Sequence, residues 1–178
     1  MIRTPRLLLR PWRESDLEPY AALNADPAVR EFLGPPLTRE QSDFEARRTQ
    51  GHLERYGFGF WAVEIPDEAS FIGFVGLMHC FLENVPFLPA VELAWRLARP
   101  HWGKGYATEA AQYALQDGFG RVGLAEAVAF TFEGNKRSRA AMERLGMARN
   151  PAEDFNHPNL AAGHPLRPHV LYRLSQPI

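Results

Sequence analysis

One stretch of the chain constrains the fold more than any other, because a strand pattern, a glycine turn and a helical stripe follow one another within residues 91–119. Residues 91–98 alternate apolar side chains with a mixed set that includes Glu92 and Arg96, which predicts a strand with two unlike faces. Gly103-Lys104-Gly105 then precedes apolar residues at helical spacing. A strand, a glycine turn and a helix in this order favour anion binding, because free N–H groups at the helix start point toward the ligand.

Diphosphate is the ligand expected at such a turn, but the sequence of the turn does not match two well-known phosphate-binding motifs. A P-loop needs Lys followed by Ser or Thr after its second glycine, whereas Gly105 is followed by Tyr106-Ala107. The dinucleotide-binding fingerprint needs a third glycine at the position that Thr108 occupies. Taken alone, the turn is explained equally well as a compact strand-to-helix connection that only requires glycines.

The rest of the chain mixes strand and helix patterns. Alternation or short apolar runs predict strands at residues 7–10, 58–65, from 71 onward, 127–132 and 169–174. Helices are predicted after two capping boxes, Ser15-x-x-Glu18 and Thr38-x-x-Gln41, the second ending near Gly57, and over residues 138–145. Four prolines predict an irregular loop over residues 149–168. We therefore expect an α/β or α+β fold with a mixed sheet, in a single domain over residues 1–178.

Composition excludes several functional classes. The 178 residues carry 20 Lys and Arg against 21 Asp and Glu, so no basic excess points to nucleic acid. The longest uncharged run, residues 69–82, is shorter than the roughly 20 residues of a membrane-spanning helix, and the N-terminus lacks the apolar core of a signal peptide. Cys80 is the single cysteine, which excludes an internal disulfide. These features predict no nucleic-acid or membrane partner and a cytoplasmic location.

Several motifs together resemble one protein family. Trp102-Gly103-Lys104-Gly105-Tyr106-Ala107-Thr108-Glu109-Ala110, preceded by Glu92-Leu93-Ala94-Trp95 and followed by Asn135-Lys136-Arg137-Ser138 and Leu145-Gly146-Met147, resembles the GNAT superfamily of acyl-CoA-dependent N-acetyltransferases. Thr4-Pro5-Arg6-Leu7, followed by Arg10 and Asp16, is similar to the opening of its ribosomal-protein N-terminal acetyltransferase branch. The resemblance thus spans the whole chain. Pro100 stands where the superfamily usually has Gln or Arg, a departure of little weight because backbone amides bind the ligand.

The resemblance implies a mostly antiparallel sheet, flanked by helices and splayed between its fourth and fifth strands, here about residues 91–98 and 127–132. Acetyl-CoA would lie in the gap as cosubstrate, with its pantetheine arm paired to the strand that contains Leu97. The diphosphate would sit on backbone amides of Trp102, Gly103, Lys104, Gly105, Tyr106 and Ala107. Asn135 and Ser138 match positions that hold the pantetheine arm and approach the thiol. For the charges of Lys104, Lys136 and Arg137, an exposed surface role is favoured over a phosphate contact.

Acetyl transfer to an amine needs a base, because an alkylammonium is mostly protonated at pH 7. Glu92, on the mixed face of its strand, is the first candidate, and a role in bracing Arg96 or a loop is weighed equally. Asp154 is the second candidate, together with its neighbour Glu153. Ser138 is the candidate acid by its match to a serine of the branch, and a helix N-cap is its alternative role.

The C-terminal segment is rich in histidine, with His157, His164 and His169 spread between prolines. Their spacing matches no zinc-binding pattern, so we expect no metal. Residues 154–166 instead predict part of the acceptor pocket, with His157 and His164 as substrate contacts.

The sequence as a whole predicts an enzyme that transfers an acetyl group from acetyl-CoA to a primary amine. A protein N-terminal α-amine is the first acceptor, and a small amine such as a polyamine or an aminoglycoside-like drug is the second. A non-catalytic acyl-CoA-binding or sensory domain is the alternative, and a nucleotide-binding P-loop module is disfavoured. Exposed strand edges are compatible with a homodimer.

Overall fold

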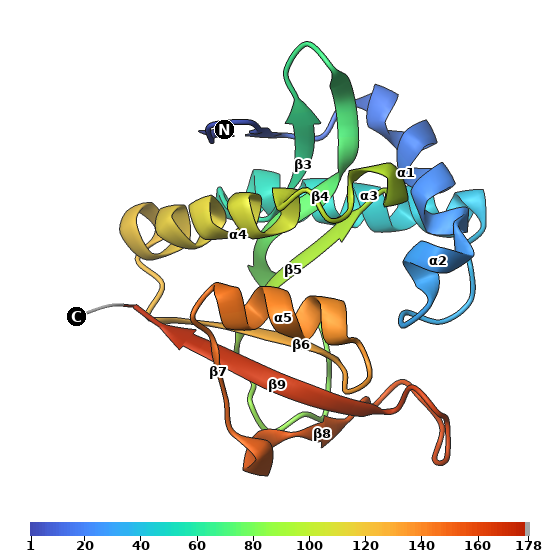
Figure 1. Cartoon of the computed structure of the whole chain (residues 1–178), viewed down its shortest axis with the longest axis vertical. Coiled ribbons are helices and arrows are strands. Elements are labelled where there is room, and N and C mark those ends of the chain that lie inside the picture. The colour runs from blue at the N-terminus through green and yellow to red at the C-terminus, as the bar shows by residue number, and fades with distance from the viewer. Residues whose placement is uncertain (177–178) are drawn as a thin grey trace.

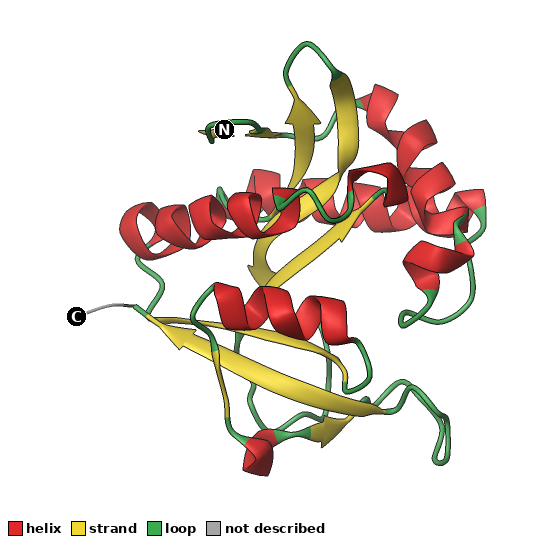
Figure 2. Ribbon diagram, viewed as in Figure 1, coloured by secondary structure: helices red, strands yellow, loops and turns green. Residues whose placement is uncertain are grey.

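The computed structural model describes residues 1–176, in which a nine-stranded sheet carries helices on both faces (Figures 1 and 2). The spatial order is β1-β2-β3-β4-β5-β6-β9-β7, with β8 also paired to β9. The strands are β1 (Ile2–Arg3), β2 (Leu8–Arg10), β3 (Phe60–Ile65), β4 (Ala69–His79), β5 (Val91–Leu97), β6 (Glu126–Phe132), β7 (Ala148–Arg149), β8 (Phe155–Asn156) and β9 (Pro168–Ser175). Every pairing among them is antiparallel except that of β5 with β6.

Five α-helices occur in the described part of the chain: α1 (Leu17–Ala25), α2 (Pro27–Arg30), α3 (Arg39–Tyr56), α4 (Tyr106–Asp117) and α5 (Lys136–Arg144). The predicted capping box of α3 is confirmed, since the Gln41 N–H donates to Thr38 Oγ1 at 3.2 Å and the Thr38 N–H donates to Gln41 Oε1 at 2.9 Å. The same helix ends at Gly57, whose φ of +72° is a left-handed conformation that glycine adopts without strain. Within residues 1–176, no helix has the length and apolar character needed to cross a bilayer.

The sheet opens between β5 and β6. These two parallel strands share a single register position, Glu92 opposite Val128, whereas β4 and β5 pair along seven positions. The predicted fourth and fifth strands are β5 and β6, because the two-residue β1 was not predicted. The expected α/β fold with a splayed, mostly antiparallel sheet is confirmed.

Helices cover the two faces of β3–β5 differently (Figure 1). On one face Leu93 and Leu97 belong to the core that includes the alanine stripe of α4. On the other face Ala94 packs with the apolar residues of α1 and α3, among them Tyr20 and Ala46. Side chains alternate along a strand, so Glu92, Ala94 and Arg96 share the face that α1 and α3 cover.

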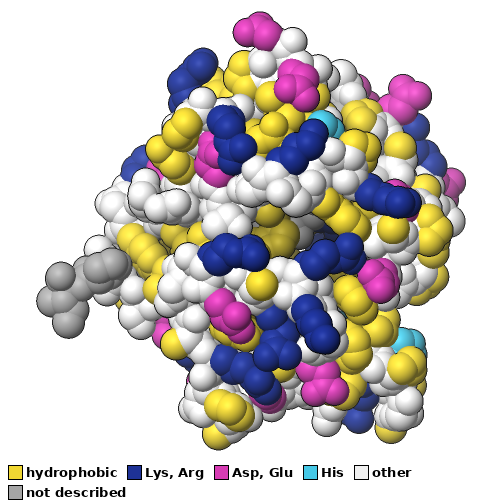
Figure 3. All heavy atoms as spheres, viewed as in Figure 1, with side chains coloured by type: hydrophobic (Ala, Val, Ile, Leu, Met, Phe, Trp, Pro, Cys, Tyr) yellow, Lys and Arg dark blue, Asp and Glu magenta, His cyan; other side chains and the backbone are white. Residues whose placement is uncertain are grey.

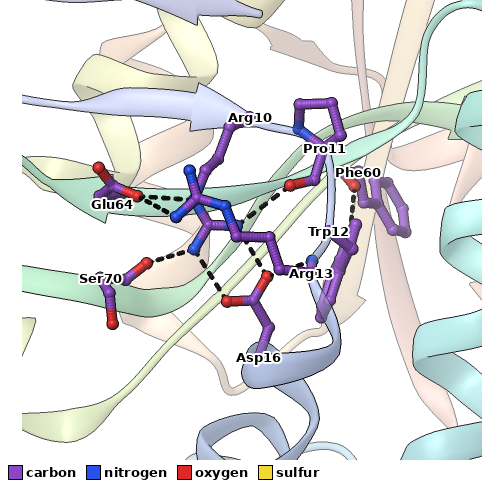
Figure 4. A network of polar contacts seen from close by, with 8 residues as sticks. All are labelled: Arg10, Pro11, Trp12, Arg13, Asp16, Phe60, Glu64 and Ser70. Atoms are coloured by element: carbon purple, nitrogen blue, oxygen red, sulfur yellow. Dashed lines mark hydrogen bonds and ion pairs between the residues drawn. The ribbon is translucent and has the colours of Figure 1, made fainter.

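A buried ion-pair network joins β2 to the 3-10 turn that precedes α1 (Figure 4). Arg10 is almost fully buried, and its guanidinium donates two hydrogen bonds to Asp16, at 2.7 and 2.8 Å. Its Nε donates to Glu64 at 2.7 Å, and its Nη2 donates to the Ser70 carbonyl. This network gives the Arg10 and Asp16 of the family-like opening a structural role.

Two local predictions were wrong. Ser15 and Glu18 form no capping box, because a 3-10 turn over Glu14–Asp16 precedes α1 and the Asp16 carboxylate accepts the Arg13 N–H at 2.7 Å. The segment 149–168 is not wholly irregular, because a 3-10 turn over Pro151–Glu153 leads to β8, and β7 and β8 both pair with β9. Both short strands form by contact with a distant strand, which local sequence patterns do not report.

Candidate active site

A large cavity lies where the sheet splays. Its volume is about 1530 Å³, and its wall combines helices α1 to α5, strands β4, β5 and β6, the glycine turn and parts of residues 157–169. Figure 3 shows a hollow in the face that carries α4 and α5, with Lys and Arg side chains along its rim. A space of this size exceeds the roughly 300–1,000 Å³ of ordinary small-ligand pockets and suits a long cosubstrate together with an acceptor.

The glycine turn forms one end of this cavity. Gly103 and Gly105 both line it, with φ angles of +73° and +81°, a region that side chains other than glycine rarely adopt. The Glu109 N–H makes the first hydrogen bond of α4, to the Gly105 carbonyl at 3.0 Å. The preceding N–H groups of the first turn therefore have no intrahelical acceptor. A side chain at Gly103 would project into open space, so the turn has room for diphosphate against its backbone.

The N-terminal segment holds this turn in place. Glu109, in the first turn of α4, accepts hydrogen bonds from the Thr4 hydroxyl at 2.6 Å and from the Arg6 Nε at 2.6 Å. The Arg6 Nη1 donates in turn to the Lys104 carbonyl at 2.9 Å, and its guanidinium lies 4.7 Å from the centre of the Tyr106 ring. The Lys104 side chain is exposed and does not line the cavity.

Trp102 contacts both the end of β5 and the start of α5. Its indole N–H donates to the Leu97 carbonyl at 2.7 Å, which occupies one acceptor of the strand expected to face the pantetheine arm. The Arg137 guanidinium lies 4.3 Å from the centre of the Trp102 ring and forms an ion pair with Glu31 at 2.8 Å. Arg137 thus has a carboxylate partner as well as a position on the wall of the cavity.

Asn135 and Ser138 lie together at the start of α5. The Asn135 side chain is the N-cap, accepting the Ser138 N–H at 3.2 Å, and its amide donates to Thr131 Oγ1 and Ser138 Oγ at 3.0 Å each. The alternative role of Ser138 as the N-cap is therefore wrong. Because the Ser138 hydroxyl oxygen accepts this bond, its O–H remains available to donate into the cavity that it lines.

Glu92 lies at the single point where β5 meets β6, and it lines the cavity. Burial raises its pKa from 4.5 to about 7, against the opposing charges of Arg48 and Arg96. A carboxyl group with this pKa exchanges protons readily at neutral pH, as a general base must.

Arg96, four residues farther along β5 and on the same face, has a different carboxylate partner. It forms an ion pair with Glu45 of α3 at 3.1 Å and donates to Asn24 Oδ1 at 2.6 Å and to the Tyr20 hydroxyl at 3.3 Å. Burial raises the pKa of Tyr20 to about 12, so this phenol stays protonated. Among the described residues, no hydrogen bond joins Glu92 to Arg96. The alternative role of Glu92, bracing Arg96, therefore has no direct contact behind it.

A protein-family model described as an acetyltransferase (GNAT) domain matches residues 6–148. The chain belongs to the GNAT acetyltransferase family. The acetyltransferase is 30% identical over 145 residues to the uncharacterized protein YkkB of Bacillus subtilis (strain 168), an alignment that covers 81% of this chain and 83% of YkkB. It is an acetyl-CoA-dependent enzyme by its family.

Solved structures share this architecture. An acetyltransferase from Agrobacterium tumefaciens str. C58 is 27% identical, with a TM-score of 0.79 over 98% of this chain and 94% of that one. RimL, a ribosomal L7/L12 alpha-N-protein acetyltransferase in complex with coenzyme A, is 15% identical, with a TM-score of 0.75 over 97% of this chain and 95% of RimL. At that identity the likeness is one of fold.

The acetyltransferase brings most of the predicted site residues to the cavity. Those that line it are Glu92, Leu97, Trp102, Gly103, Gly105, Tyr106, Ala107, Asn135, Ser138 and His157, together with Lys136, Arg137 and His169. Burial lowers the pKa of His169 to about 4 and also lowers that of His157, so both rings are neutral at pH 7. Among the described residues no cluster of three or more His, Cys, Asp or Glu is arranged to hold a metal ion.

Two predicted contacts lie elsewhere. Asp154 does not line the cavity, because its carboxylate forms an ion pair with Arg149, and Glu153 pairs with Arg173 at 2.7 Å. The His164 ring is also outside the lining and accepts the Leu166 N–H at its Nδ1, at 3.2 Å.

Sequence reasoning missed the charged residues that α2 and α3 contribute to the cavity, namely Arg30, Glu45 and Arg48. The helix that carries Glu45 and Arg48 reads as a polar surface helix, since its charged residues outnumber its apolar ones. The one available signal was spacing: Glu45, Arg48, Thr49 and His52 recur at helical intervals, and Thr49 and His52 are buried.

Proposed function

We propose that this acetyltransferase transfers the acetyl group of acetyl-CoA directly to a primary amine, with Glu92 as the general base. The observation that carries the proposal is the position of Glu92, inside the cavity that also holds the glycine turn and at the point where β5 and β6 separate. When bound, acetyl-CoA supplies an activated thioester. Glu92 accepts the proton of the incoming ammonium, directly or through a water molecule, so that a neutral amine attacks the thioester carbonyl.

The unpaired edge of β5 and the start of α5 provide the remaining groups. Beyond Glu92 the backbone of β5 has no partner in β6, so its N–H groups on that side are available to the pantetheine arm and to the thioester oxygen. The Ser138 O–H is free to donate, and its proton passes to the departing thiolate of CoA. Attack leaves a second proton on the amine nitrogen, and this proton restores the Ser138 hydroxyl after Ser138 has protonated the thiolate. The first proton leaves Glu92 for solvent, so the ammonium and acetyl-CoA yield an amide, CoA and one proton.

A protein or peptide N-terminal α-amine remains the first proposed acceptor. The fold-level likeness to RimL, whose name includes an alpha-N-protein acetyltransferase activity, supports this class. The wall formed by Phe81, Leu82, His157, Leu160 and Leu166 surrounds the acceptor with mostly apolar groups beside neutral histidine.

The test is a panel of peptides and small amines incubated with acetyl-CoA, with product mass and CoA release followed together. We expect a mass gain of one acetyl group on some acceptors and an equal molar release of CoA. Tight CoA binding without release on any acceptor would instead support a non-catalytic acyl-CoA-binding domain. The Ser138→Ala variant should lower kcat while leaving acetyl-CoA affinity nearly unchanged, because Asn135 alone caps α5.

A further inference from the structure

We propose that the acceptor carries a carboxylate close to its reactive amine, and that Arg48 binds this carboxylate at the mouth of the cavity, with Arg30 as a second source of positive charge. This inference rests on the proposed function, whose acceptor it narrows. It concerns the acceptor half of the cavity, defined here as the part lined by α1 to α3 and the Glu92 face of β5.

The charges of the cavity divide between its two halves. Lys136, Arg137 and Arg144 line the cavity from α5, and the Arg137 guanidinium lies over the Trp102 ring beside the glycine turn, so we assign these charges to the CoA half. Glu109, the carboxylate at that end, is already bonded to Thr4 and Arg6. The acceptor half contains three arginines, Arg30, Arg48 and Arg96, and two glutamates, Glu45 and Glu92.

Positive charge in the acceptor half exceeds negative charge. Arg96 and Glu45 neutralise each other in their 3.1 Å ion pair. Glu92 is only partly ionised at pH 7, since burial raises its pKa to about 7. His157, which lines the cavity from the segment after β8, adds little positive charge because burial lowers its pKa. Arg30 and Arg48 are therefore left without a carboxylate partner among the described residues.

Arg30 is buried, and its hydrogen bonds go to backbone carbonyls, from its Nε to Pro35 at 3.0 Å and from its Nη2 to Leu33 at 3.0 Å. Carbonyl oxygens orient a guanidinium but do not cancel its charge. A buried arginine that lines a cavity and forms no ion pair raises the affinity of that cavity for anions.

Arg48 has the geometry of a ligand-binding side chain. It extends from α3 over the Phe81 ring, 5.0 Å from the ring centre, which holds the guanidinium at the edge of the cavity. Arg48 and Glu92 line the same cavity, and the positive charge of Arg48 opposes the rise that burial causes in the pKa of Glu92. An amine beside Glu92 and a carboxylate beside Arg48 would therefore belong to one small group, such as an amino acid or the first two residues of a peptide.

The same distribution disfavours a polyamine acceptor. A polyamine would bring two or more positive charges into a half-cavity that already has excess positive charge. Among the described residues that line this half, Glu92 is the only acid outside an ion pair, and it is only partly ionised.

The experiment compares matched acceptors that differ by a single charge. Peptides with Asp or Glu at their second position are compared with the Asn or Gln peptides, and free amino acids with their amides, which separates a peptide source from a small-molecule source. We expect kcat/KM to be about 10- to 100-fold higher for the carboxylate member of at least one pair, the usual effect of a charge-assisted hydrogen bond. Arg48→Gln should abolish that preference and leave the KM for acetyl-CoA unchanged.

Arg47→Gln is the matched control, because Arg47 is the neighbouring exposed arginine of α3 and does not line the cavity. The control should retain the wild-type preference. Equal losses on the charged and neutral members in Arg48→Gln would overturn the proposal, since they would show that Arg48 acts only through Glu92. Equal kcat/KM of the wild type on the carboxylate and amide members of every pair would also overturn the proposal.

Calorimetric binding of the same acceptors to the CoA complex separates this inference from the proposed function. Tighter binding of the carboxylate member, lost in Arg48→Gln, supports the inference even if no acceptor is acetylated. In that case the proposed transfer reaction would fail while the anion-binding role of Arg48 would stand. Absence of any carboxylate preference in both binding and turnover would refute the inference alone.

Discussion

Replacing Glu92 by glutamine should stabilise the fold while impairing the reaction, because both effects depend on the ionisation of its carboxyl group. The pKa of Glu92 is about 7 in the folded protein, against an ordinary 4.5, because burial penalises its charged form. Each pKa unit corresponds to about 1.4 kcal/mol. The ionised carboxylate therefore lowers the free energy of unfolding by about 3 kcal/mol at pH 8, where it is charged in both folded and unfolded states.

The sign of the pH dependence follows from the direction of this shift. A carboxyl group whose folded pKa is raised holds its proton more tightly in the folded state, so its unfavourable contribution grows as pH rises from 4.5 through 7. At pH 5 the contribution is only about 1 kcal/mol. Glutamine cannot ionise, so the stability advantage of Glu92→Gln should increase by about 2 kcal/mol between pH 5 and pH 8.

Denaturant unfolding of the wild type and of Glu92→Gln at pH 5, 6, 7 and 8 measures the difference in their free energies of unfolding. Equal m-values would show that the two unfolded states are comparable. In parallel, kcat/KM of Glu92→Gln should fall by about 10²–10³, with acetyl-CoA affinity nearly unchanged. The loss should shrink at high pH, where more of the amine arrives neutral. A stability difference that does not vary with pH would refute the buried-carboxyl reasoning, and a parallel pH–rate profile would remove Glu92 as the base.

Three further substitutions test the parts that surround the site. Gly105→Val should weaken CoA binding at least about tenfold, because its φ of +81° is strained for a branched side chain, and calorimetry with CoA measures this. Glu109→Gln should raise the KM for acetyl-CoA more than that for the acceptor, because it loosens the Arg6 clamp on the glycine turn; equal changes would contradict this role. Asp16→Ala should lower the free energy of unfolding by about 3–5 kcal/mol by leaving the buried Arg10 short of its partner, and a loss below about 1 kcal/mol in denaturant unfolding would show that Glu64 and Ser70 suffice.

Local interactions explain what could be predicted correctly. The capping box of Thr38 and Gln41, the left-handed Gly57 and the alternation along β5 each depend on residues within a few positions, so their sequence patterns carry the information. The glycine turn before α4 belongs to the same class, because its backbone angles require glycine wherever the turn lies in the fold.

Contacts between distant residues decided the rest. Ser15 has no capping role because Asp16 binds Arg10 and the Arg13 N–H at the start of α1. Asp154, the second candidate base, lies outside the cavity in an ion pair with Arg149. In both cases the residue types were compatible with the predicted role. The partner that the fold placed beside each carboxylate determined the outcome.

By itself, the sequence determined the order of the main strands and helices, the glycine turn before α4 and the family to which the chain belongs. Only the tertiary structure decided which charges meet in the cavity: Arg96 forms an ion pair with Glu45, Arg48 forms none among the described residues, and burial raises the pKa of Glu92. The physical reason is that the charge state of a side chain depends on its burial and on its neighbours in space, and both are set by packing of segments far apart in the chain.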